Sequence, residues 1–459
     1  MKGAHMEHSR PVVLTIAGSD SGGGAGIQAD LKTITVHGCF GISAITALTA
    51  QNTIGVQGIF PVPLDFIQQQ LTSLFDDFSI VSAKTGMLHS PEVVKLIADN
   101  MKIHPELKLV CDPVMVAKSG DKLLEDSAIQ TLKNALLPLA TVVTPNIPEA
   151  EVLWGHPIKS EGDKEAACRA IHEIGSRSVF LKGGHGKGAF STDLFYDGHR
   201  FHRFKSPRYP TKNTHGTGCT TSAAIASNLA RGKDMVSAVA DAKAFMDTAI
   251  RFSLSIGHGH GPTDHLATIQ QEVEKYKVIQ GLQAALERLC THSAGYLIPE
   301  VQTNLAYGLP FATTHEEVAA IPGRIVNLNG RPHASGCPAF GASRHIASIV
   351  LTVMRFSLLH RSVMNIRYDS KFLDNAEKLG LVIRSFDRKN EPISVKNQEG
   401  STLEWGTQEV LKRTNEIPDL IFDTGDIGKE PMIRVIGTTP MEVVTTALEI
   451  GGIHVKKEM

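Results

Sequence analysis

The sequence has 459 residues, more than one hydrophobic core normally holds, so we expect two domains. Hydrophobic residues make up 42% of it and charged residues 20%, and the formal net charge is −1, which leaves no positive excess for binding nucleic acid. Six widely spaced cysteines, and no run of about 18 apolar residues, predict a reduced, cytoplasmic location without a membrane segment.

Residues 11–265 have the pattern of alternating strands and helices. Short apolar runs are each followed by an amphipathic stretch, as βα units that pair into a parallel sheet require. The clearest strands are expected at residues 12–16, 107–111, 141–143 and 179–182. We therefore predict an α/β domain with a mainly parallel central sheet.

Each of these strands runs directly into a polar or glycine-rich turn. The turns are Ala17–Asp20, Asp112–Val114, Thr144–Asn146 and Gly183–His185. Ligands of open α/β sheets bind at the carboxyl ends of the strands, so we expect these turns to lie on one rim and to form a small-molecule site.

The segment Thr214–Thr220 is the most informative turn. Gly216 and Gly218 let the backbone approach a phosphate closely, and the free N–H groups of a following helix attract an anion. Cys219 would stand at the helix start, where the helix dipole should lower its pKa and make it a base for a substrate hydroxyl. Taken alone, the motif fits a plain glycine-rich helix start with a buried cysteine better, but it does not stand alone.

A set of motifs in the same order resembles the hydroxymethylpyrimidine/phosphomethylpyrimidine kinases of the ribokinase superfamily, over about residues 11–265. The motifs are Ala17–Asp30, Thr46–Thr53, Lys84–Met87, Asp112–Val114, Thr144–Asn146 with Glu149, Leu181–His185 and His215–Cys219. The glycine spacing of the first differs from the dinucleotide fingerprint and from the Walker A loop. Many ribokinase relatives have an aspartate base where this kinase family, and this sequence, have a cysteine.

The resemblance implies a ribokinase-like αβα fold and a role for each motif. The Gln51 amide, which both donates and accepts, would bind an aminopyrimidine. The other residues of that pocket would be Gly18, Asp30, Met87 and Val114. The catalytic turn would consist of Gly216, Gly218 and Cys219.

The same resemblance implies ATP and Mg²⁺ as cofactors. Asp112 and Glu149 would hold the metal, although a structural carboxylate is an equally good interpretation of either one alone. Lys182 would meet the nucleotide phosphates. The further nucleotide-binding residues would be Thr144, Asn146, Gly183 and Thr217.

The pattern changes after the glycine-rich stretch Gly257–Pro262, which closes the first domain. Residues 268–290 are predicted to form an amphipathic helix. We expect domains at residues 11–265 and 295–459, joined by a helical linker at 266–294. The second is predicted to be a smaller α+β domain, with a helix near 343–359, strands near 364–368 and 420–422, and a helix after Pro440.

Basic and acidic side chains stand beside glycine turns in the second domain, at residues 322–324, 341–345, 365–369 and 422–431. They indicate phosphate binding or, equally well, surface ion pairs. The domain resembles the ThiN-type thiamine-phosphate synthase over about residues 295–455. The resemblance implies that Arg324 and His345 are catalytic, that Arg344, Asn365, Arg367 and Lys429 bind substrate, and that Asp423 binds metal. A structural hydrogen bond is the alternative for His345.

The two resemblances imply an enzyme of thiamine biosynthesis, which phosphorylates a hydroxymethylpyrimidine twice and joins the diphosphate to a thiazole phosphate. The expected partners are these small molecules and further copies of the chain in a homo-oligomer, with no nucleic acid and no membrane. Two alternatives stay open. The second domain could bind thiamine phosphate without catalysis, as a sensor or dimerisation module, and the first could be a pyridoxal kinase, against which Cys219 counts.

Overall fold

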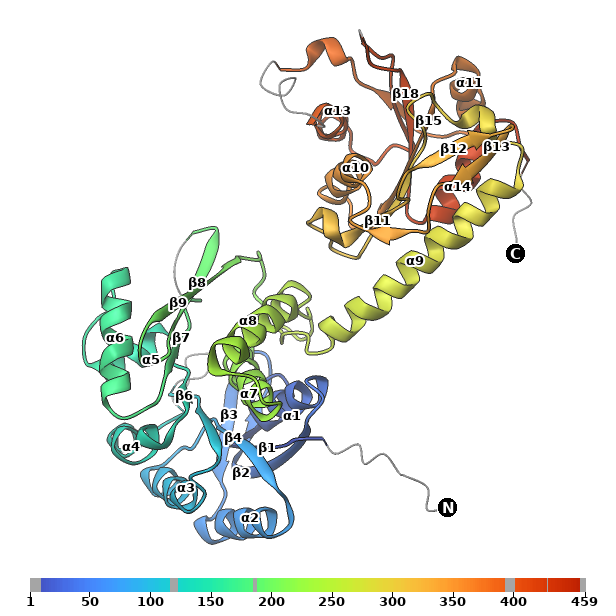
Figure 1. Ribbon diagram of the computed structural model, residues 1–459. Helices are drawn as coiled ribbons and strands as arrows, with labels where there is room; N and C mark the ends of the chain where they lie inside the picture. The colour runs from blue at the N-terminus through green and yellow to red at the C-terminus, as the bar shows by residue number, and fades with distance from the viewer. Residues whose placement is uncertain (1–9, 116–122, 185–187, 393–400, 427, 455–459) are drawn as a thin grey trace, which may run out of the picture. The chain divides into compact units, whose positions relative to one another are not determined.

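The computed structural model describes residues 10–115, 123–184, 188–392, 401–426 and 428–454 (Figure 1). It divides the chain into two compact units, Met1–Ile269 and Gln270–Met459. Each unit has its own sheet and its own hydrophobic core, as the length of the chain predicts. His185 of the kinase motifs lies outside the described residues. Among the residues described, no helix is long and apolar enough to cross a bilayer.

The first unit is built on a nine-stranded sheet. Its strands are β1 (Val12–Asp20), β2 (Phe40–Gln51), β3 (Val56–Pro61), β4 (Ile80–Thr85), β5 (Lys108–Cys111), β6 (Val142–Val143), β7 (Val179–Leu181), β8 (Phe190–Tyr196) and β9 (Phe201–Pro207). Their order is β3-β2-β1-β4-β5-β6-β7-β8-β9. The strands from β2 to β7 in this order are parallel, and β3, β8 and β9 are antiparallel to their neighbours. The predicted mainly parallel sheet is confirmed.

Helices cover both faces of this sheet (Figure 1). Successive strand residues point to opposite faces, so Val13 and Leu14 of β1 belong to different cores. The helices on the Val13 side are α1 (Gly26–Val36), α7 (Thr217–Ala230) and α8 (Met235–Arg251). Those on the Leu14 side are α2 (Leu64–Asp77), α3 (Pro91–Ile103), α4 (Asp126–Thr131), η1 (Leu132–Leu136), η2 (Leu137–Leu139), α5 (Ile147–Trp154) and α6 (Glu161–Glu173).

Helix α7 packs against the sheet through small side chains. Every residue from Thr220 to Ala230 is buried, and the Ser227 and Ser222 hydroxyls bond back to carbonyls of the preceding turn. The helix contacts β1, β4 and β5, so that its first turn lies beside the end of β5. This packing places the predicted anion-binding turn at the carboxyl ends of the central strands.

The second unit contains a seven-stranded sheet in the order β14-β11-β10-β15-β18-β17-β16. These strands are β10 (Leu305–Gly308), β11 (Val318–Ala320), β14 (Ala339–Phe340), β15 (Ser362–Arg367), β16 (Ile383–Ser385), β17 (Leu420–Asp423) and β18 (Met432–Gly437); a separate hairpin is formed by β12 (Ile325–Leu328) and β13 (Arg331–Ala334). All pairs in the large sheet are antiparallel except β16 with β17. The helices are α9 (Ala267–Thr291), η3 (Gly295–Leu297), η4 (His315–Glu317), α10 (Arg344–Met354), α11 (Ser370–Lys378), η5 (Arg388–Asn390), α13 (Ser401–Lys412) and α14 (Pro440–Ile450). The predicted α+β fold class of the second domain is confirmed.

Helix α9 is the helix expected at residues 268–290, but it is more than a connector. Val273 and Tyr276 are exposed, whereas Leu282, Leu286 and Leu289 are buried in the core of the second unit. Most of the expected linker at residues 266–294 is therefore a core element of that unit, and the structure divides the chain just after Ile269.

Candidate active sites

A cleft of about 770 Å³ opens at the carboxyl ends of the central strands in the first unit. This volume is typical of small-molecule sites. It is lined by most of the residues predicted for the kinase site: Gly18, Gln51, Met87, Asp112, Val114, Asn146, Glu149, Lys182, Gly216, Thr217, Gly218 and Cys219. The structure thus brings together residues that lie up to 200 positions apart, as the strand-end pattern predicts.

The turn before α7 is shaped by two glycines. Gly216 is the N-cap of α7 and has a φ of 80°, and a Cβ on it would overlap the carbonyl oxygen of Gly24. A Cβ on Gly218 would lie 3.3 Å from both the Asp112 carboxylate and the Lys182 ammonium. Only glycine fits the first position, and at the second it leaves the backbone N–H groups of a long helix open to an anion.

Cys219 lies in the first turn of α7 and lines the cleft. Burial raises the pKa of its thiol to about 11, and the nearby Lys84 ammonium opposes this effect only in part. The expectation that the helix dipole lowers this pKa is therefore wrong, because loss of water around the sulfur outweighs it. Near neutral pH Cys219 holds its proton.

Asp112 and Lys182 form an ion pair in the cleft. The Lys182 Nζ lies 2.9 Å from Oδ1 of Asp112, which also accepts from the Thr144 hydroxyl at 3.1 Å. Burial works against the charge of Lys182, but Asp112 and Glu149 leave its pKa raised. Within the part of the chain that the structure describes, Oδ2 of Asp112 has one weak hydrogen-bond partner, the Ser222 hydroxyl at 3.4 Å.

Glu149 has two roles in the structure. Its carboxylate accepts from the backbone N–H of Asn146 at 2.7 Å, and the Asn146 side chain accepts from the Glu149 N–H at 2.9 Å, which caps helix α5. It also lines the cleft. Burial raises the pKa of Glu149 to about 7, with Lys182 acting in the opposite direction and Asp112 adding to the rise.

Three predicted site residues do not line the cleft. Asp30 is fully buried and pairs with Lys84 at 2.9 Å. Thr144 is also fully buried and bonds to Asp112. The Gly183 N–H donates to Asp193 at 2.6 Å, and the carbonyl of Thr192 blocks any side chain there.

A second group of polar side chains lines the far part of the cleft, and the sequence pattern did not single it out. Lys243 of α8 pairs with Asp193 at 2.9 Å and with Asp247 at 3.1 Å. Arg208 donates to the carbonyls of Gly184 and Gly183, at 2.8 and 3.4 Å. These contacts fix the turn that follows Lys182. No sequence motif predicts them, because they join residues of separate strands and helices.

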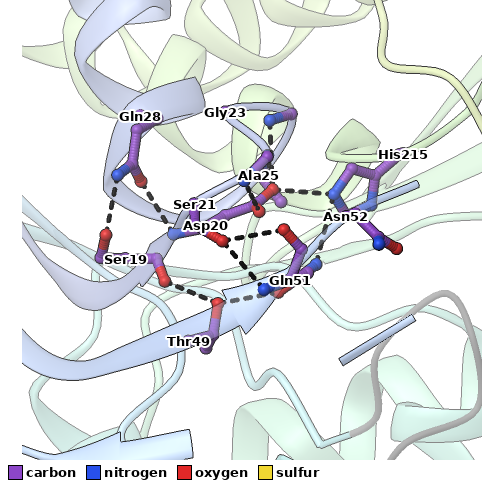
Figure 2. Close-up of polar contacts among 12 residues, drawn as sticks. Ser19, Asp20, Ser21, Gly23, Ala25, Gln28, Thr49, Gln51, Asn52 and His215 are labelled. Carbon is purple, nitrogen blue, oxygen red and sulfur yellow. Dashed lines mark hydrogen bonds and ion pairs between the residues drawn. The ribbon is translucent and has the colours of Figure 1, made fainter. Parts of the chain in front are cut away.

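Figure 2 shows a network of hydrogen bonds around Gln51 that the sequence pattern also did not predict. The His215 Nε2 lies 2.8 Å from Asp20 Oδ2 and 3.3 Å from the side-chain amide of Gln51. The Ser21 hydroxyl donates to the Gln51 carbonyl at 2.8 Å and accepts from its N–H at 2.9 Å. The loop after β1 is thereby tied both to the end of β2 and to the turn before α7.

In the second unit, two of the predicted residues, Asn365 and Arg324, form hydrogen bonds to the same segment, residues 301–304. Asn365 of β15 accepts from the Asn304 N–H at 2.8 Å and donates to the Gln302 carbonyl at 3.0 Å. Arg324 is exposed, has a φ of 69°, and its guanidinium donates to the carbonyl of Val301. Arg367 is exposed at the end of β15, and Lys429 lies 3.8 Å from Glu391.

His345 and Arg344 are exposed in the first turn of α10. Within the described parts of the chain, no hydrogen bond or ion pair joins His345 to Arg324. The two predicted catalytic residues therefore belong to different segments that this structure does not connect directly.

Asp423 is not placed to bind a metal. Arg388 donates to both of its carboxylate oxygens, at 2.6 and 3.1 Å, and the fully buried Arg434 donates to Oδ2 at 2.8 Å. The structure does not support the predicted metal role, because two guanidinium cations already occupy the positions that a cation would need. Among the described residues, no group of three or more His, Cys, Asp and Glu side chains could hold a metal.

Comparison with known proteins agrees with this division of the chain. Residues 20–264 match the family model of phosphomethylpyrimidine kinase, and residues 281–449 match thiamine-phosphate synthase ThiN. The chain is 52% identical over 257 residues to the thiamine biosynthesis bifunctional protein ThiED of Geobacter sulfurreducens, covering 56% of this chain and 52% of that protein. It is 51% identical over 260 residues to the hydroxymethylpyrimidine/phosphomethylpyrimidine kinase of Haemophilus influenzae, covering 56% and 96%.

Solved structures resemble the first unit. An ADP complex of Bacillus subtilis pyridoxal kinase matches with a TM-score of 0.54 and 39% identity, over 57% of this chain and 99% of that one. Staphylococcus aureus pyridoxal kinase with AMP-PCP and pyridoxal matches with a TM-score of 0.53 and 36% identity, over 57% and 95%. The ribokinase-like fold is thus confirmed, and the chain belongs to the phosphomethylpyrimidine kinase family, with a ThiN domain behind the kinase domain.

Proposed function

We propose that the protein makes thiamine phosphate in three steps. The first unit phosphorylates 4-amino-5-hydroxymethyl-2-methylpyrimidine and then its monophosphate, and the second joins the diphosphate to thiazole phosphate with release of pyrophosphate. The observation that carries the proposal is the single cleft that unites a glycine-bounded helix start, the Asp112–Lys182 pair and the Gln51 amide. The family match of both units supports it.

In the kinase steps the protein acts by positioning and by charge. The N–H groups from Gly216 to Cys219 would hold the transferring phosphoryl group, and Lys182 would bind the nucleotide phosphates as a point charge. The substrate hydroxyl oxygen forms the new bond to phosphorus while the bond to ADP breaks. The Cys219 thiol would first give its own proton to solvent water, a loss that the positive charge of Lys84 favours, and the resulting thiolate would then accept the hydroxyl proton of the substrate.

ATP and Mg²⁺ are the proposed cofactors of this unit. Two carboxylates suit Mg²⁺, which in kinases takes its remaining ligands from phosphates and water. Among the described residues, Oδ2 of Asp112 accepts one weak hydrogen bond, and a nearby cation favours the ionised form of buried Glu149. Both side chains therefore fit the metal. Bound Mg²⁺ would neutralise phosphate charge.

In the second unit Arg324 is the best candidate to bind the departing pyrophosphate, since guanidinium groups pair with phosphate oxygens. Arg344 and Arg367 are exposed and would serve the same chemistry, and Lys429 is exposed beside Glu391. Asn365 and His345 complete the proposed set. The alternative is that this unit binds thiamine phosphate without catalysis.

One assay separates these possibilities. The protein is incubated with the hydroxymethylpyrimidine, Mg-ATP and thiazole phosphate, and products are followed by chromatography. Thiamine phosphate is expected. Accumulation of the pyrimidine diphosphate would remove the synthase claim and favour the binding module, and phosphorylation of pyridoxal but not of the pyrimidine would make the first unit a pyridoxal kinase.

A further inference from the structure

We propose that Asp20 and His215 set the substrate specificity of the first unit by fixing the orientation of the Gln51 amide, so that the site selects a 4-aminopyrimidine over its 4-oxo analogue. The inference rests on the proposed kinase function and deepens it. His215 and Asp20 act here as positioning residues, because they reach the substrate through Gln51.

The first step concerns Asp20. Its carboxylate is 2% exposed and accepts from the N–H groups of Gly22, Gly24 and Ala25, at 2.8, 3.1 and 2.8 Å. Burial disfavours the charge, but His215 and the backbone N–H groups outweigh it and leave the pKa of Asp20 below its ordinary value. An ionised carboxylate can only accept hydrogen bonds.

The second step follows for His215. Its Nε2 lies 2.8 Å from Asp20 Oδ2, so Nε2 must carry a hydrogen and donate it, whether or not Nδ1 is also protonated. The same Nε2 lies 3.3 Å from the atom assigned as Nε2 of Gln51 (Figure 2). Two donors would then face each other. Because amide nitrogen and oxygen are assigned from the network around them, Gln51 must turn its oxygen toward His215.

The contacts of Thr49 support this orientation. Its hydroxyl donates to the Ser19 carbonyl at 2.9 Å, and it has only one hydrogen to give. It lies 3.2 Å from the other terminal atom of the Gln51 amide. With the oxygen toward His215, the amide nitrogen faces Thr49 and donates to a hydroxyl lone pair. In this orientation no two donors face each other, whereas the opposite orientation places the amide NH₂ against the His215 N–H.

The main chain of Gln51 cannot compensate for a wrong amide orientation. The Ser21 hydroxyl binds both its N–H and its carbonyl, so only the side-chain amide is free to turn. Figure 2 shows these contacts on one side of Gln51 and His215 on the other.

The orientation determines what a ligand meets. The Gln51 amide has two oxygen lone pairs and two N–H groups. The contacts to His215 and Thr49 use one of each, and the remaining lone pair and N–H form one edge and point in the same direction, toward a ligand. Glutamine reads adenine with this edge, through a ring nitrogen that accepts and an amino group that donates. A 4-aminopyrimidine offers the same pattern. A 4-oxopyrimidine offers N–H and C=O in reverse order, so donor meets donor and acceptor meets acceptor.

The test compares kcat/KM for the 4-amino and 4-oxo forms of the hydroxymethylpyrimidine. His215→Gln should lower the ratio of the two values about tenfold or more, mainly through KM, because glutamine can donate or accept and no longer fixes Gln51. Thr49→Val, which removes the acceptor at the other end, should lower the ratio in the same direction. His202→Gln is the matched control, since His202 makes the same 2.8 Å contact to Asp197 outside the cleft.

Proportional loss of both activities in His215→Gln, with the ratio unchanged, would mean a merely structural role and would overturn the inference. If this variant does not fold, Thr49→Val decides, and an unchanged ratio there has the same meaning. A wild-type protein that phosphorylates neither pyrimidine would refute the kinase proposal itself, and the inference with it, so the two failures are distinguishable.

Discussion

At the scale of single residues, the chemistry of Cys219 depends on its surroundings more than on its place in a motif. The motif puts a sulfur at a helix start, where an exposed thiol would become acidic. In the structure Cys219 is half-buried at the cleft, and the loss of water around its thiol raises the pKa to about 11. The residue is a strong base only once it has lost its proton, which makes Lys84 part of the catalytic setting.

Cys219→Ala is expected to lower kcat for phosphorylation about 10²- to 10⁴-fold, the usual worth of a general base. ADP release with the hydroxymethylpyrimidine as acceptor measures it. Cys337→Ala, at an exposed cysteine of the second unit, should keep full activity. Undiminished turnover in Cys219→Ala would exclude the base role.

The raised pKa of Glu149 predicts a pH dependence of metal binding. A carboxyl with a pKa of about 7 is mostly protonated at pH 6 and mostly ionised at pH 8, and only the ionised form attracts Mg²⁺. The Mg²⁺ concentration for half-maximal kinase activity should therefore fall as the pH rises across this range. Glu149→Gln should weaken Mg²⁺ binding, so that more Mg²⁺ is needed for half-maximal activity, and it should flatten this pH profile. An unchanged profile would contradict the assignment.

Asp423 predicts a stability effect. Asp423→Asn would leave two buried guanidinium groups with no compensating charge, and we expect a loss of about 3 to 5 kcal/mol in the free energy of unfolding, measured with urea. Asp426→Asn on the neighbouring turn is the comparison variant. Stability that is lost on chelation of metal, rather than on this substitution, would restore a metal role for Asp423.

The sequence predicts which residues line the cleft where a side chain follows a strand or a glycine turn. Asp112, Lys182 and Gly216 could be found because their own neighbours in the chain mark them. Asp423 could not be interpreted correctly, because its partners Arg388 and Arg434 lie on other elements and only the fold brings them within 3 Å. The same holds for Lys243 and Asp193.

At the scale of elements, strands were predicted well because buried parallel strands are short runs of apolar residues with a clear end. The expected strand at residues 141–143 appears as β6, and the expected strand at 179–182 as β7. Helix α9 was located correctly but its role was not, since an amphipathic pattern shows that a helix has a buried face without showing what covers it.

The start of α7 offers a prediction at this scale. Gly216 and Gly232 both have a positive φ, but a Cβ on Gly216 would overlap a carbonyl, whereas a Cβ on Gly232 meets open space. Gly232→Ala should cost about 1 to 2 kcal/mol in the free energy of unfolding, the cost of a left-handed conformation for a residue with a Cβ. Gly216→Ala should cost more and should also abolish phosphorylation, because the loops after β1 and before α7 must separate. Equal effects of the two substitutions would contradict this account of the turn.

At the scale of the whole molecule, the two units have separate cores, so a substitution that inactivates one unit should leave the activity of the other unchanged. A Cys219→Ala protein supplied with the pyrimidine diphosphate and thiazole phosphate should form thiamine phosphate at the wild-type rate. A His345→Ala protein given the hydroxymethylpyrimidine and Mg-ATP should stop at the diphosphate. Loss of phosphorylation in both variants would show that this division of labour is wrong.

The buried side chains of helix α9 also determine where the chain can be divided into fragments that fold. A fragment that starts at residue 295 would lack Val278, Leu282, Leu286 and Leu289, which are buried against the sheet. Each such side chain contributes about 1.5 to 3 kcal/mol, so the missing group approaches the entire stability of an average domain, about 5 to 15 kcal/mol. A fragment meant to express the second unit alone, or to join it to another protein, should keep the chain from Ala267 onward.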